Sequence, residues 1–380
     1  MMNKKRIVFS AFSVILLFLV AACSSGPQDT GGAPKTPFLG GTAGLQAEFL
    51  EGNPPAEVTD GNTFGFKAIV SLKNNGETDI AANGVKVSLV GFLPSLFGVT
   101  ESLSDKMYNE AITGKTRDSE GNVIEPVEIP IEFPTSTEFK FSAPVAGNIV
   151  TIFRANVCYK YQTRAVSEVC VLQNQIEVPK GAICTPSGLK PIFSSASPIQ
   201  VNAFKQNAAG KNKMQFSFDI AHSGQGSIFD PTIVADCPTD STNKRNKEDK
   251  VNVIVKTGIG TAGQLKCVGL NPPTVAGQAS GSIKLINGKR SITCTQDIPV
   301  GSDFKKTVDI TVDFNYLTNT DKEVLIKHLF DSGPCNNDCF CDPGENIAGC
   351  PKDCPSAPYA CGSICCPTGT LGKPGCPAIC

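Results

Sequence analysis

The cysteines are the residues of this chain that could carry chemistry, because a thiol can form a disulfide, bind a metal or carry a lipid. The chain has 380 residues, and 17 of them are cysteines. Only two are histidines, His222 and His328, and none is tryptophan. Most hydrolase, metal and acid–base sites use histidine, so the composition favours a protein that is not an enzyme.

The first cysteine follows a typical export signal. Three basic residues at positions 4–6 precede an apolar run over residues 7–20, and two alanines then lead to Cys23. This order resembles the lipobox of prokaryotic membrane lipoproteins. The resemblance implies that residues 1–22 are a signal peptide and that Cys23 becomes a lipidated N-terminus. Ordinary cleavage before an incidental cysteine and an uncleaved anchor are the alternatives, and all three place the rest of the chain outside the cytoplasm.

The other sixteen cysteines are an even number, which suits eight disulfides in an oxidising compartment. They are Cys158, Cys170, Cys184, Cys237, Cys267, Cys294, Cys335, Cys339, Cys341, Cys350, Cys354, Cys361, Cys365, Cys366, Cys376 and Cys380.

Three disulfides are expected before the tail. Cys158 and Cys170 are expected on the two arms of one hairpin, where a cross-strand bond would close a short loop. For the second half of the chain we expect the pairs Cys267–Cys294 and Cys184–Cys237.

The last ten cysteines lie in residues 333–380, a tail with too few apolar residues for a core of its own. Such a segment needs disulfides or zinc. The adjacent Cys365 and Cys366, the lack of histidine and the export signal favour disulfides. Residues 341–355 resemble a C-D-x-G-E and C-P-x-D-C motif of exported bacterial and archaeal proteins, which implies an extracellular module. The preceding stretch, residues 335–340, departs from that pattern.

Oxygen-bearing side chains cluster around this motif and could bind Ca²⁺ as a structural ion, the one cofactor we consider. They are Asp338, Asp342, Glu345, Asn346 and Asp353. The alternative is that these residues only form turns in a small disulfide knot.

The rest of the chain alternates between apolar and polar residues at period two. Residues 64–72, 214–220 and 308–316 show this pattern, and Gly, Pro and Asn turns separate such runs. We therefore predict an all-β protein: a flexible tether over residues 23–37, then two tandem antiparallel Ig-like β-sandwiches over residues 38–178 and 179–332, then the disulfide-rich module over residues 333–380.

Two local patterns refine this architecture. Asn287-Gly288 is expected to turn a hairpin. Residues 161–171 and 316–326 share the pattern Y-x-T-x4-E-V-x-[VI] without gaps, and we interpret it as the last hairpin of a duplicated domain. Chance similarity between two hairpins is the alternative.

The net charge is -1, and no basic excess points to nucleic acid. The tandem sandwiches are similar to adhesion-related and fibronectin-like modules of prokaryotic surface proteins. We therefore expect a non-catalytic, membrane-anchored binding or adhesion protein outside the cytoplasm, with a protein or envelope partner. A structural spacer in a cell-envelope assembly is the alternative, and a solute-binding protein or an enzyme is a third.

Overall fold

The computed structural model describes residues 36–328 except 146, 262–263, 272–274, 300 and 302, and also residues 358–361 and 364–367. The signal peptide, Cys23 and most of the tether and tail lie outside the described residues. The described part is mostly β-structure arranged in several antiparallel sheets, as the sequence predicted. The finer assignment to tandem Ig-like sandwiches does not follow from the topology alone.

We call the first group of strands the first module. One of its sheets has the order β1-β3-β8, formed by β1 (Leu45–Phe49), β3 (Ala68–Asn74) and β8 (Glu128–Phe133). The other contains β5 (Asp105–Tyr108), β4 (Val85–Val90), the beginning of β9 (Ile149–Val171), the end of β19 (Phe304–Lys327) and β2 (Glu57–Thr59). In β3 every second residue is buried, as expected for a strand with one face in a core.

The second module repeats this arrangement. One sheet has the order β10-β12-β13-β18-β16, formed by β10 (Gly188–Leu189), β12 (Ile199–Gly210), β13 (Lys213–His222), β18 (Lys289–Asp297) and β16 (Leu265–Cys267). The other contains β17 (Gln278–Lys284), β15 (Lys250–Lys256), the beginning of β19, the end of β9, β11 (Ile192–Ser194) and β14 (Ser227–Phe229).

The remaining elements are short. They are β6 (Thr116–Arg117) and β7 (Val123–Ile124), which form an exposed hairpin, the 3-10 helices η1 (Pro94–Phe97) and η2 (Glu101–Ser104), the helix α2 (Ser241–Lys247), and the paired strands β20 (Pro358–Cys361) and β21 (Ile364–Pro367). Buried apolar residues of both modules belong to one continuous core.

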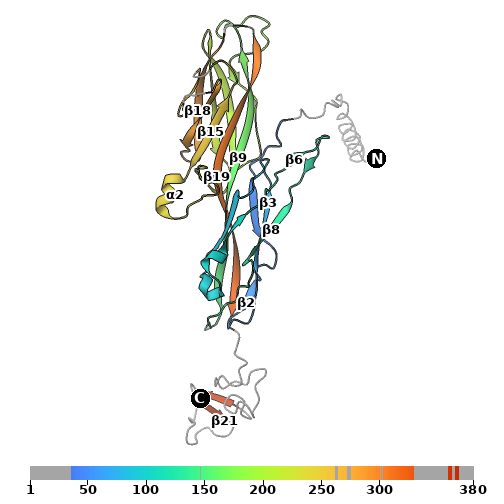
Figure 1. Ribbon diagram of the computed structural model, residues 1–380, viewed down its shortest axis with the longest axis vertical. Helices are drawn as coiled ribbons and strands as arrows, with labels where there is room; N and C mark the ends of the chain where they lie inside the picture. Colours follow the sequence, from blue (N-terminus) through green and yellow to red (C-terminus); the bar gives the residue numbers. More distant parts are fainter. Residues whose placement is uncertain are drawn as a thin grey trace, which may run out of the picture. The chain divides into compact units, whose positions relative to one another are not determined.

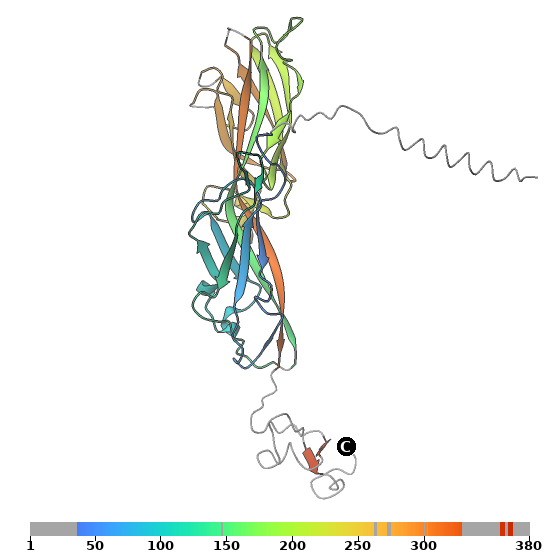
Figure 2. The same ribbon diagram turned by 90° about the vertical axis from the view of Figure 1, so that its right-hand side faces the viewer.

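Two long strands join the modules. β9 and β19 pair antiparallel without a break from Ile149↔Ile326 to Val171↔Phe304, and they run side by side through both groups of strands (Figure 1 and Figure 2). β9 starts beside β4 and ends beside β11, whereas β19 starts beside β15 and ends beside β2. Each long strand therefore begins in one module and ends in the other.

The repeated sequence motif lies on these two strands rather than on hairpins, so the expected hairpins are wrong. The reason is local: residues 161–168 contain no Gly, Pro or Asn to turn the chain. Instead, odd-numbered residues of β9 stay buried from Phe153 to Val171 in one continuous alternation.

The pairing itself repeats between the modules. β4 joins β9 with Lys86 opposite Cys158, and β15 joins β19 with Asn252 opposite Asp313, the residue that the motif aligns with Cys158. The two modules are thus related by an approximate two-fold axis near the pair Lys160↔Asn315.

Two buried tyrosines make equivalent hydrogen bonds on either side of this axis. The Tyr161 hydroxyl donates to Asn74 Oδ1 at 3.0 Å and accepts from the Thr78 amide at 3.3 Å. The Tyr316 hydroxyl accepts from the Gly226 amide at 2.7 Å and is hydrogen-bonded to His222 Nε2 at 3.0 Å. His222 is therefore a partly buried structural residue.

The turn at Asn287-Gly288 forms as predicted, with positive φ at both residues. The predicted hairpin does not extend beyond this turn. Only Ile286 and Lys289 pair across it. β17 then pairs with β15, and β18 pairs with β13 in the other sheet.

Because three tyrosine side chains are buried, the folded protein should become less stable at alkaline pH. Desolvation raises the pKa of Tyr159, Tyr161 and Tyr316 in the folded protein. Because the unfolded chain ionises these phenols near their usual pKa, the free energy of unfolding should fall as pH rises above about 10. Denaturant titrations between pH 8 and 11 measure this slope.

Tyr159→Phe, which removes one of the three ionisable groups, should make the slope shallower. A rise in tyrosinate absorbance near pH 10 for all three residues, with the circular dichroism unchanged, would contradict the prediction.

Candidate functional site

The structure contains three disulfides in the described part of the chain. They are Cys158–Cys237, Cys170–Cys184 and Cys267–Cys294. Disulfides persist in oxidising compartments, so these bonds indicate an extracytoplasmic location.

The predicted bond Cys158–Cys170 is wrong. Both cysteines lie on β9, twelve residues apart, which corresponds to about 40 Å of extended strand. The predicted pair Cys184–Cys237 is wrong as well, because Cys184 bonds Cys170 and Cys237 bonds Cys158. Cys267 and Cys294 form the expected bond between β16 and β18.

The other predicted sites fall outside the described residues or on strands whose side chains are not described. Cys23 and the five residues considered for Ca²⁺ (Asp338, Asp342, Glu345, Asn346 and Asp353) lie outside. Within the described part, no group of three or more His, Cys, Asp or Glu side chains is placed to hold a metal ion. No described helix has the length and apolar character needed to span a membrane.

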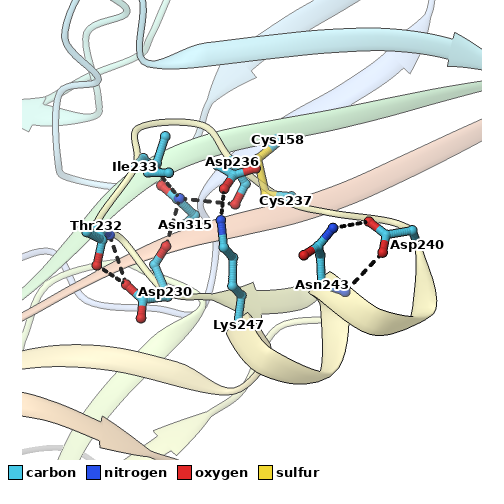
Figure 3. Close-up of polar contacts among 10 residues, drawn as sticks. All are labelled: Cys158, Asp230, Thr232, Ile233, Asp236, Cys237, Asp240, Asn243, Lys247 and Asn315. Atoms are coloured by element: carbon cyan, nitrogen blue, oxygen red, sulfur yellow. Dashed lines mark hydrogen bonds and ion pairs between the residues drawn. A yellow bond between two sulfur atoms is a disulfide. The ribbon is translucent and has the colours of Figure 1, made fainter.

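The most elaborate site in the described residues is a loop that we call the pinned loop, residues 230–240, between β14 and α2. It is bound covalently to β9 through Cys237–Cys158. The amide of Asn315 on β19 adds a second attachment (Figure 3). Asn315 Nδ2 donates to the carbonyl oxygens of Asp230 at 3.0 Å, Ile233 at 2.6 Å and Asp236 at 3.3 Å. One buried side chain on the central ladder therefore fixes the loop at three points.

An ion pair and a hydrogen-bonded carboxylate add further contacts in the pinned loop. Lys247 of α2 forms an ion pair with Asp236. Burial raises the pKa of Asp230, but hydrogen bonds from Thr232 and the nearby charges of Lys250 and Lys247 outweigh it, so the net shift is downward. The loop thus begins at a carboxylate that stays ionised at neutral pH.

The last residue of the pinned loop caps α2. Asp240 accepts from the Asn243 amide at 2.9 Å and from Asn243 Nδ2 at 3.1 Å, which lowers the pKa of Asp240. The capping explains why the short helix α2 begins at Ser241.

The pinned loop holds two aliphatic side chains in solvent. Ile233 is 58% exposed and Val234 is 45% exposed. Val234 also lines a groove of about 370 Å³ with Ala81, Ala82 and Lys160. Cys237 of the same loop lines a second, more polar groove of about 410 Å³. An immobilised loop that has an apolar tip and lines two grooves is suited to binding, because little conformational entropy is lost on contact.

The pinned loop also breaks the two-fold similarity of the modules. It lies in the connection from β13 to β15, residues 223–249, whereas the equivalent connection from β3 to β4 is only residues 75–84. Sequence analysis missed this site. The available signal was Cys237, an isolated cysteine in a turn-rich segment whose partner could not be identified from spacing.

Comparisons with known proteins give no relative that identifies the chain. No family model and no curated protein matches it. Among solved structures, the secreted serine protease VesC from Vibrio cholerae matches with 7% identity and a TM-score of 0.16. That match covers 70% of this chain and 50% of VesC, so this chain spans only half of that protein.

A second match is to the manganese lipoxygenase of Gaeumannomyces graminis, solved with part of zonadhesin of Komagataella pastoris. It has 12% identity and a TM-score of 0.10, and covers 74% of this chain and 87% of that one. Neither similarity is close enough to assign a fold or a function.

Asn315→Ala should loosen the pinned loop. The two amide protons of Asn315 are shared among three carbonyl oxygens, and losing these contacts from a buried side chain should lower the free energy of unfolding by about 2–3 kcal/mol. Amide hydrogen exchange at residues 232–236 should speed up in the same variant. A denaturant titration measures the change in stability, and mass spectrometry measures the exchange.

The matched control is Asn319→Ala, an exposed position on the same strand, where a change within about 0.5 kcal/mol is expected. Equal costs for the two variants would mean that Asn315 does not hold the loop.

Proposed function

We propose that this protein is a non-catalytic, membrane-anchored surface lipoprotein that acts as a binding or adhesion module. The observation that carries the proposal is the pinned loop, in which a disulfide and Asn315 immobilise a segment that exposes Ile233 and Val234. Exposed aliphatic side chains held on a rigid scaffold are typical of contact surfaces between proteins.

The proposal includes the finer architecture. The two modules are duplicated sandwiches of the Ig-like type, followed by a disulfide-rich module at residues 333–380. The repeated strand pairing and the two sheets in each module support this interpretation. A lipid on Cys23 and the tether of residues 23–37 would hold the modules near the membrane, and the partner is a protein or another envelope component, not nucleic acid.

A structural spacer in an envelope assembly is the second candidate. The unbroken β9–β19 ladder favours it, because 23 consecutive residue pairs connect the modules without a flexible linker. A spacer would need the ladder but not the apolar tip of the pinned loop, which separates the two functions experimentally.

The anchor is tested by Cys23→Ala. In the native membrane, mass spectrometry should find lipid on an N-terminal Cys23 of the unaltered protein, whereas the variant should carry no lipid. An unaltered protein that keeps residues 1–22 and carries no lipid would point to an uncleaved anchor instead.

The binding function is tested at the apolar tip. Replacing both Ile233 and Val234 with Asp should weaken binding of the lipid-free chain to isolated cell envelopes about tenfold or more, because two exposed contact residues become charged. Ile176→Asp, at an aliphatic residue of similar exposure outside the loop, is the control. Binding unchanged by the double substitution would favour the spacer.

A further inference from the structure

The first strand of each module has the same sequence pattern. Residues 45–51 read L-Q-A-E-F-L-E, and residues 199–206 read I-Q-V-N-A-F-K-Q. The extra residue of the second stretch is Ala203, which lies in a bulge between Asn202 and Lys205 and has a positive φ of 54°. β1 and β12 are therefore equivalent strands, with Phe49 in the place of Phe204.

The two strands differ at their outer edge. In the second module β10 covers the edge of β12, where Leu189 pairs with Lys205 and the Lys190 amide donates to the Phe204 carbonyl at 2.9 Å. In the first module β1 pairs only with β3 among the described strands.

The register of β1 shows which backbone groups face the open edge. The Gly44 carbonyl accepts from Asn75 at 3.0 Å, and the Leu50 amide donates to Ile69 at 2.8 Å. Even-numbered residues of β1 therefore bond to β3, and the amides and carbonyls of Ala47 and Phe49 point the other way. In the described part of the chain these groups have no hydrogen-bond partner. Open ladder positions of this kind are a template for another strand.

The surface beside this edge is negatively charged. A groove of about 450 Å³ lies over the outer face of β1 and β3, and its lining includes Glu48, Glu51, Leu50 and the ion pair Lys73–Glu128. Within the described residues neither Glu48 nor Glu51 forms an ion pair. Leu50 is 43% exposed and provides an apolar contact next to the two carboxylates.

We propose that the edge of β1 at Ala47 and Phe49 binds an extended segment of a partner protein as an added antiparallel strand. Complementarity to Glu48 and Glu51 requires that the segment carry lysine or arginine. Alternate side chains of such a strand would lie over the acidic groove, while its backbone completes the ladder as β10 does at β12. The inference rests on the proposed binding function but concerns a surface separate from the pinned loop.

The test uses the intact, disulfide-bonded chain and a fluorescent decapeptide of alternating lysine and valine. An alternating glutamate and valine decapeptide serves as the reversed-charge probe. We expect the lysine peptide to bind at least about tenfold more tightly by fluorescence anisotropy, with affinity falling as salt increases. Hydrogen exchange should show new protection at the Ala47 and Phe49 amides.

Variants separate the backbone and charge contributions. Ala47→Pro removes an amide that faces the open edge but makes no bond to β3, so peptide binding should be lost. Glu48→Gln and Glu51→Gln should each weaken binding by about threefold to tenfold, and they remain informative if the proline variant fails to fold. Glu132→Gln is the control, because Lys67 already pairs with that carboxylate at 2.9 Å on the same sheet.

Equal binding of the two peptides, no effect of the variants, or protection elsewhere would overturn the proposal. A dimer in sedimentation that Ala47→Pro dissociates would assign the edge to a second copy of the chain and would overturn it too. Envelope binding that depends on Ile233 and Val234 but not on Ala47 would leave the pinned loop as the contact surface and reject this edge alone.

Discussion

The antiparallel pairing of β9 with β19 is the interaction on which the rest of the structure depends. Its 23 residue pairs place one buried face under both modules and one outer face on which the loops rest. The outer face would otherwise expose Cys158 and Cys170, and both are covered because disulfides draw loops onto them. The ladder therefore sets the core on one side and the attachment points of the loops on the other.

Because the two modules are approximately two-fold related, equivalent positions can be compared and the places where the modules differ can be identified. Equivalent positions carry equivalent contacts where the fold needs them, as Tyr161 and Tyr316 show. The pinned loop and the uncovered edge of β1 are departures from this similarity, because each occurs in only one of the two modules. Features that only one of two similar modules has are the natural places to look for binding.

The period-two alternation predicted the strands well, because strands such as β3, β13 and β19 bury one face and therefore leave a local signal. Pairing was harder to predict. The Asn287-Gly288 sequence predicts a chain reversal but not the partners of the flanking strands. β17 and β18 join different sheets, and this depends on the packing of the whole fold. The disulfide Cys158–Cys237 joins residues 79 positions apart, and it forms because the fold brings the pinned loop to β9. The pairing therefore could not be predicted from the spacing of the cysteines.

The exchange of strand ends between the modules has a consequence for the synthesis of the chain. The sheet of the first module contains the end of β19, so that module cannot be completed until residues 316–327 have left the ribosome. The two modules therefore cannot fold one after the other as independent units. The first module must stay incomplete until nearly all of the described part of the chain has been synthesised.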